Sequence, residues 1–122
     1  MTSMIAKRKP GTEAKVRAEG ERRIEAIAKP YRPGERETWP VQIAEAEAVT
    51  ADPATPTPLL DALRAPRGLT VAQMAARVLT KRDQFRSEAG AILAAQESLI
   101  ATDPIPHDYA DDAHWPAGSG ES

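Results

Sequence analysis

The sequence contains no cysteine, which excludes a disulfide framework and a thiolate metal site. Aromatic residues are few, with one Phe, two Tyr and two Trp among 122 residues. Much of the 41% hydrophobic fraction is alanine, which buries little surface. Such a chain can build only a thin core, of the kind that usually needs a partner. We therefore expect the protein to be oligomeric or bound in a larger assembly.

Long apolar runs are also missing. No run approaches the roughly 18 apolar residues that indicate a membrane-spanning helix. The first residues, MTSMIAKRKPG, lack the apolar core of a signal peptide. The sequence thus predicts neither a membrane span nor a secretory signal.

The net charge of −2 conceals an uneven distribution. Residues 1–36 carry ten Lys or Arg and five Asp or Glu, whereas residues 103–122 carry five acids and no base. A basic segment can contact nucleic acid. Here the cations alternate with glutamates, which favours a solvated helix face. Nucleic-acid binding is therefore the lesser alternative.

Proline positions and apolar spacing predict an all-α fold. We expect short, proline-jointed helices packed on one long helix, with extended or disordered N- and C-terminal arms. The predicted ranges are a basic arm with a weak helix (1–36), a helical domain (37–102) and an acidic flexible tail (103–122). The weak helix is expected from about residue 13 to residue 29, capped by Thr12.

Two short helices are expected in the middle of the chain. The segment PYRPGERE, residues 30–37, is predicted to be a linker, because its prolines lack a backbone donor. The next helix should begin at Thr38 as its cap, with Trp39 as the main anchor of the core. After a proline-rich joint, Thr57 should cap a third helix whose leucines form an apolar side. Gly68 suits the position after its last turn.

The long helix has the clearest signal. Thr70 and Gln73 form a capping-box pattern, and no proline follows before Pro104. Large apolar residues then recur at a heptad spacing, at Val71, Val78, Phe85, Ile92 and Leu99. We expect the first half of this apolar stripe to pack on the short helices and the second half on something else.

The residues that could bind a metal ion lie in the tail. Its segment HDYADDAH contains both histidines among carboxylates: His107, Asp108, Asp111, Asp112 and His114. These are legitimate ligands for zinc or manganese. A flexible tail offers no second shell to orient them, so no metal site is predicted. The alternatives are an unconstrained acidic tail, or a strand that docks Tyr109 and Trp115 into a neighbour's groove.

No catalytic site is predicted either. No serine, threonine or carboxylate pair lies beside a histidine on a predicted rigid element. A basic face on the long helix, formed by Arg77, Lys81, Arg82 and Arg86, suggests intrahelical pairing, with phosphate binding as an alternative. We therefore predict no enzyme and no cofactor. The predicted partner-binding residues are Trp39, Phe85, Ile92, Leu99, Tyr109 and Trp115.

Residues 37–97 resemble a small helical domain found in tail-fibre-associated and tail-fibre assembly proteins of bacteriophages and prophages. The resemblance is carried by ETWPVQ, ADPATPTPLLDAL, RGLTVAQMAARVL and FRSEAGAIL, and covers about half of the chain. The proline-rich joint followed by leucines is the most distinctive of these segments. Family members are mostly alanine-rich where Pro66 stands, so this chain differs from the family pattern at the end of the third helix.

The resemblance implies a helical interaction module of a phage tail and transfers no catalytic residues. The expected function is a non-enzymatic structural or adaptor protein associated with the tail fibre or baseplate, with phage tail or tail-fibre proteins as partners. The alternative is a tail-fibre assembly chaperone that is not retained in the virion. A nucleic-acid-binding regulator is the third possibility. The expected location is the virion tail, or the host cytoplasm during assembly.

Overall fold

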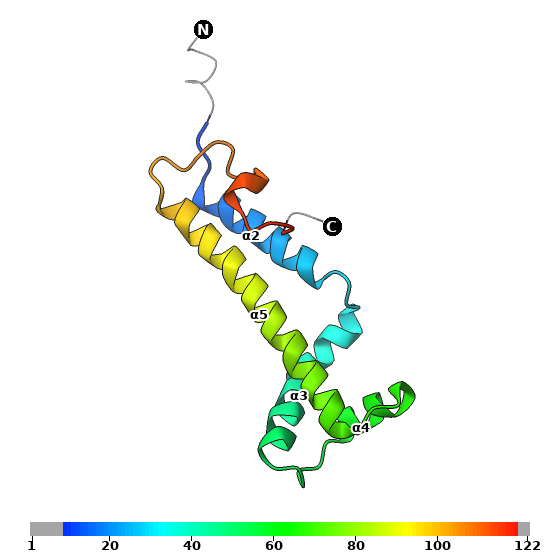
Figure 1. The fold of residues 1–122 in the computed structure, drawn as a ribbon. Helices are drawn as coiled ribbons and strands as arrows, with labels where there is room; N and C mark the ends of the chain where they lie inside the picture. The colour runs from blue at the N-terminus through cyan, green and yellow to red at the C-terminus, as the bar shows by residue number, and fades with distance from the viewer. Residues whose placement is uncertain (1–8, 120–122) are drawn as a thin grey trace. The chain divides into compact units, whose positions relative to one another are not determined.

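A computed structural model of the protein describes residues 9–119. Within them the chain is helical and contains no β-strand. The elements, in chain order, are α2 (Glu13–Ala28), α3 (Pro33–Ala51), α4 (Pro58–Arg64), the 3-10 turn η1 (Ala65–Arg67), α5 (Val71–Ala101) and the 3-10 turn η2 (Asp112–His114). The predicted all-α class, with short proline-jointed helices packed on one long helix, is confirmed (Figure 1).

The chain forms two compact units. Unit 1 comprises the described parts of Met1–Lys29 and Ser87–Ser122, and unit 2 is Pro30–Arg86. Helix α5 contributes its first half to unit 2 and its second half to unit 1. These boundaries differ from the predicted ranges 1–36, 37–102 and 103–122, because α2 and the tail pack together on the second half of α5.

Unit 2 has a small aliphatic core. It is formed by Ala46, Val49, Leu60, Met74, Ala75 and Val78. These residues come from α3, α4 and the first half of α5, and Leu60 is fully buried. The expectation that the first half of α5 packs on the short helices is therefore correct.

Helix α3 begins earlier than expected. It starts at Pro33, so most of the predicted linker is helical, and the prediction that Thr38 caps the helix is wrong. Proline suits a first helical position, where its fixed φ is already helical and no donor is needed. The Thr38 hydroxyl instead donates to the Glu35 carbonyl at 2.7 Å.

Helix α4 is capped from a distance. Thr57 is the residue before the helix but its side chain makes no capping bond, contrary to prediction. The Glu45 carboxylate of α3 accepts from the backbone N–H of Leu59 at 3.1 Å and of Leu60 at 3.0 Å. Beyond α4, the chain tightens into η1 at Pro66, and Gly68 adopts a left-handed φ of 66°, as expected.

Helix α5 begins with the predicted capping box. The Gln73 N–H donates to the Thr70 hydroxyl at 3.1 Å, and the Thr70 N–H donates to the Gln73 side chain at 2.9 Å. The helix then runs for 31 residues. Leu69, just before the cap, packs on the core that contains Met74, as a hydrophobic staple does.

Unit 1 has a second core, formed by Val16, Ile92, Leu99 and Trp115. Figure 1 shows α2 alongside the second half of α5, with the tail beside α2. Gly20 permits the close approach of the two helices, since a Cβ there would collide with the Gln96 side chain. Helix α2 and the tail are thus the surface on which the second half of α5 packs.

Among the described residues, no helix combines the length and the apolarity that a membrane crossing requires.

Candidate interaction surface

The predicted partner-binding residues do not form one surface. Ile92, Leu99 and Trp115 are 1%, 6% and 6% exposed and lie in the core of unit 1. Tyr109 is partly buried and packs against the same core. These four side chains already contact their own chain, so a partner would have to open unit 1 to reach the three buried ones. Trp39 and Phe85 remain partly exposed.

The tail is held in place by a buried arginine. Arg23 of α2 is 1% exposed, and its Nε donates to Glu19 Oε2 at 2.7 Å. Its Nη1 donates to the Ser119 hydroxyl at 2.9 Å, and its Nη2 donates to the Ala110 carbonyl at 2.9 Å and to Asp112 Oδ1 at 2.8 Å. One guanidinium therefore joins α2 to three groups of the tail.

Trp115 completes this attachment. The Arg23 guanidinium carbon lies 5.0 Å from the centroid of the Trp115 ring, within the range of a cation–π contact. The indole N–H donates to the Tyr109 carbonyl at 2.7 Å. Between residues 103 and 119 the tail has no α-helix. It is nevertheless anchored, because its polar groups bind Arg23 of α2 and the Trp115 indole fills the core.

Sequence reasoning missed the role of Arg23. It was counted with the cations of a solvated helix face. The signal was its spacing, because Val16, Gly20, Arg23 and Ile27 follow one another at intervals of four, three and four residues and share one face of a helix. A cation on the apolar face of a helix indicates a buried, paired group.

The remaining arginines of α2 are paired at the surface. Arg17 contacts Glu13 at 3.0 Å and Glu97 at 3.1 Å, and Arg22 contacts Glu19 at 2.7 Å. Hydrogen bonds to these carboxylates raise the pKa of both arginines. These arginines fit the predicted solvated helix face, and each is paired with a carboxylate there.

The pKa of the Glu19 carboxyl group in α2 is lowered. The hydrogen bond from Arg22 lowers its pKa most, and the bond from Arg23 lowers it further, while burial acts in the opposite direction. Its side chain is 11% exposed. The carboxylate therefore stays ionised, and links the surface arginine to the buried one.

The histidine and aspartate segment of the tail is used structurally. His114 Nε2 lies 3.0 Å from Asp108 Oδ1, and this bond is the main cause of a lowered Asp108 pKa. Asp111 caps η2 by accepting from the Ala113 N–H, and Asp112 contacts Arg23. Within residues 9–119, no group of three potential ligands is placed to hold a metal ion.

Unit 2 presents a cluster of aromatic rings. Tyr31 and Trp39 meet edge to face, with centroids 4.9 Å apart, and Trp39 meets Phe85 in the same way at 5.7 Å. All three rings are partly exposed. The prediction that Trp39 anchors the core is wrong, since the buried core of unit 2 is aliphatic and the indole lies outside it.

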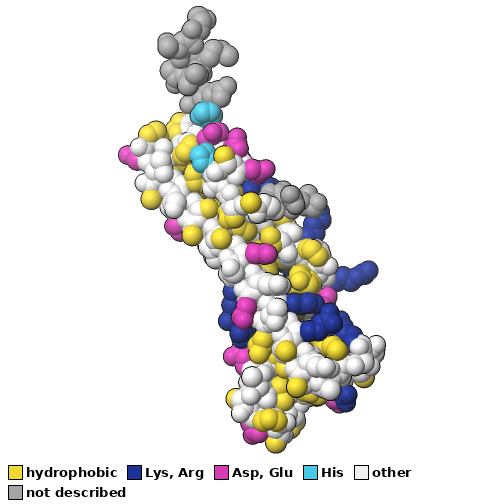
Figure 2. Space-filling view, viewed as in Figure 1, with side chains coloured by type: hydrophobic (Ala, Val, Ile, Leu, Met, Phe, Trp, Pro, Cys, Tyr) yellow, Lys and Arg dark blue, Asp and Glu magenta, His cyan; other side chains and the backbone are white. Residues whose placement is uncertain are grey.

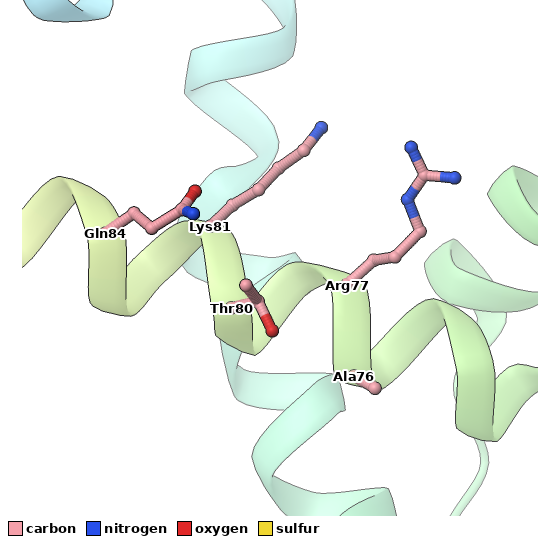
Figure 3. Close-up of a pocket in the computed structure, with 5 residues that line it drawn as sticks. All are labelled: Ala76, Arg77, Thr80, Lys81 and Gln84. Atoms are coloured by element: carbon pink, nitrogen blue, oxygen red, sulfur yellow. The ribbon is translucent and has the colours of Figure 1, made fainter.

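One cation of α5 adjoins these rings. Lys81 Nζ lies 5.6 Å from the Tyr31 centroid. Arg77 and Lys81 border a shallow depression of about 360 Å³, which Ala76, Thr80 and Gln84 also line (Figure 3). Figure 2 shows Lys and Arg side chains gathered beside apolar atoms where the start of α3 meets α5. Arg82 of the predicted basic face is instead paired, with Glu47 at 3.4 Å and Asp83 at 2.9 Å.

We call Tyr31, Trp39, Phe85, Arg77 and Lys81 the aromatic–basic face. Tyrosine, tryptophan and arginine are the side chains that most often dominate protein–protein binding energy. The depression beside these residues is shallow and open to solvent. The face suits noncovalent binding of a macromolecular surface.

Comparison with known proteins adds no relative. No family model matches the chain, and no match was found among curated proteins or among solved structures.

Proposed function

We propose that the protein is a non-enzymatic adaptor of a bacteriophage tail, which joins proteins of the tail fibre or baseplate. The observation that supports this most is the aromatic–basic face, which leaves three rings and two cations of unit 2 accessible. Four of its five residues lie within residues 37–97, the part that resembles tail-fibre-associated proteins.

The thin cores support the same proposal. Among the described residues, the core of each unit contains only a few buried aliphatic side chains and one or no buried aromatic ring. Small domains that bury little apolar surface are marginally stable, and binding of a partner adds to their stability. The proposed partners are phage tail or tail-fibre proteins, and the proposed location is the virion tail or, during assembly, the host cytoplasm. The proposed role needs no cofactor.

Mass spectrometry of purified virions tests the proposal. An adaptor should be present in near-stoichiometric ratio to a fibre or baseplate protein. Recovery with unassembled fibre but not with finished virions would replace the adaptor with an assembly chaperone. Absence from both samples would overturn a role in the tail.

A further inference from the structure

Two cations of the aromatic–basic face have no carboxylate partner among the described residues. Two other arginines of unit 2 are paired: Arg64 with Asp61, and Arg82 with Glu47 and Asp83. Arg77 and Lys81 are exposed and make no such ion pair within residues 9–119. The Lys81 ammonium lies over the Tyr31 ring, 5.6 Å from its centroid. Their charge is therefore available to a ligand.

The geometry presents both charges together. Positions 77 and 81 are one helical turn apart, so their side chains lie on the same face of α5, about 6 Å apart along its axis. Figure 3 shows Arg77 and Lys81 extending from α5 in the same general direction. The small residues Ala76 and Thr80 line the same shallow depression. A backbone can approach α5 closely at this point.

We propose that the aromatic–basic face binds an acidic helical segment of a partner protein, an inference that rests on the adaptor function proposed above. Carboxylates spaced one turn apart on that segment meet Arg77 and Lys81. An apolar side chain beside them contacts the exposed edges of Tyr31 and Trp39. The positive charge selects the acidic segment, and the rings supply apolar contact area.

A protein ligand fits this face better than nucleic acid. Binding to duplex DNA depends on many phosphate contacts, each made by a cation. The face offers two cations without a carboxylate partner among the described residues. The charge of the adjoining Arg82 is neutralised by the Glu47 and Asp83 carboxylates. Phosphates would also leave the apolar edges of the rings without a partner.

A pair of designed peptides tests the inference on the full-length protein. Each is a labelled helical peptide of about 15 residues, with capped ends and two charged residues at i and i+4 beside leucines. The charged residues are Glu in the acidic peptide and Lys in the basic peptide. Fluorescence anisotropy at low ionic strength should show binding of the acidic peptide in preference to the basic one, and added salt should weaken it.

Charge reversal on the protein provides the second measurement. The double variant R77E/K81E should bind the acidic peptide about tenfold more weakly, and should bind the basic peptide better than the wild type does. W39A should also weaken binding of the acidic peptide. The matched control is K15E/K29E, which changes the net charge equally at two exposed lysines of unit 1 and should leave binding unchanged.

Equal binding of both peptides by the wild type would overturn the inference, whatever the variants do. So would equal weakening by K15E/K29E, which would indicate an effect of net charge alone. If generic duplex DNA binds tightly and R77E/K81E abolishes it, the face binds nucleic acid and the proposal fails. If the protein shows no preference between the peptides but is present in virions, this inference is refuted and the tail function stands. If the protein prefers the acidic peptide but is absent from both virions and unassembled fibre, the tail function is refuted and this inference stands.

Discussion

At the residue scale, Arg23 carries the most specific interactions of the molecule. It is fully buried and makes four hydrogen bonds, three of which reach the tail. A buried cation is tolerated only when its donors are satisfied. Its removal therefore leaves both a cavity and unpaired polar groups.

Arg23→Ala should destabilise unit 1 by about 3 kcal/mol, because Asp112 and Ser119 lose their shared partner and Trp115 loses a ring contact. Hydrogen exchange should show faster exchange of the tail amides, and thermal unfolding should shift to lower temperature. Arg17→Ala, at an exposed ion pair, is the control and should change little. Unchanged exchange in the tail of the Arg23 variant would contradict the role given to this residue.

Leu60→Ala should destabilise the protein more than Trp39→Ala does, although the sequence predicts Trp39 as the main anchor of the core. Leu60 is fully buried, so its truncation should cost about 3 kcal/mol. Trp39 is partly exposed and loses two edge-to-face contacts, so its truncation should cost about 1–2 kcal/mol. Chemical unfolding measures both. A larger loss of stability for Trp39→Ala than for Leu60→Ala would indicate that the indole is the core anchor.

Glu19 should make unit 1 sensitive to acid. Its pKa in the folded state is lowered, mainly by the hydrogen bond from Arg22. A lowered pKa stabilises the fold at pH values above the ordinary glutamate value, about 4.3. This stabilisation is lost as the pH falls through the lower folded value. Trp115 fluorescence, measured in a Trp39→Phe background, should report the loosening of the tail in acid.

Glu19→Gln is the matching control for this pH dependence. It should reduce stability at neutral pH and flatten the acid transition, because the amide does not titrate. An acid transition identical in both proteins would assign the effect to another carboxyl group.

At the element scale, a cap can come from a distant part of the chain. The sequence pattern placed Thr57 before α4 correctly but assigned it the wrong bond, because the Glu45 carboxylate reaches the first amides of α4 from α3. No local rule brings residues 45 and 59 together. Only the packing of α3 on α4 does.

Glu45→Ala should therefore act on α4 although it lies in α3. We expect a loss of about 1 kcal/mol, the usual value of an N-terminal cap. Hydrogen exchange should accelerate at the amides of Leu59 and Leu60. Glu37→Ala, at an exposed position of the same helix, serves as the control. Normal protection of both amides in the Glu45 variant would refute long-range capping.

Some helix starts can be predicted from local sequence, whereas others depend on the tertiary structure. The capping box at Thr70 and Gln73 was predictable, because both partners lie within one turn. The start of α3 was not, because Pro33 can equally end a linker or begin a helix. Glycine lowers helix propensity in the middle of α2, but in the structure Gly20 lies against the Gln96 side chain, a contact that only the fold reveals.

At the scale of the whole molecule, two small cores share one long helix. Neither core holds more than six buried residues among those described. We expect the isolated protein to self-associate, because such small cores leave it marginally stable alone. Sedimentation velocity over a range of concentrations should show a species heavier than 13.2 kDa. A single monomeric species at all concentrations would contradict this prediction.

The sequence by itself determined the all-α class, the long helix with its cap, and the heptad stripe, because each depends on contacts within a few residues or on the helical period. It also placed Trp39, Phe85, Arg77 and Lys81 on helices. Only the tertiary structure decided which of these side chains stay accessible. Ile92, Leu99 and Trp115 are residue types found in interfaces, but α2 and the tail cover Ile92 and Leu99, and Trp115 of the tail is buried in the same core. Accessibility depends on segments that lie far apart in the chain and meet only when it folds.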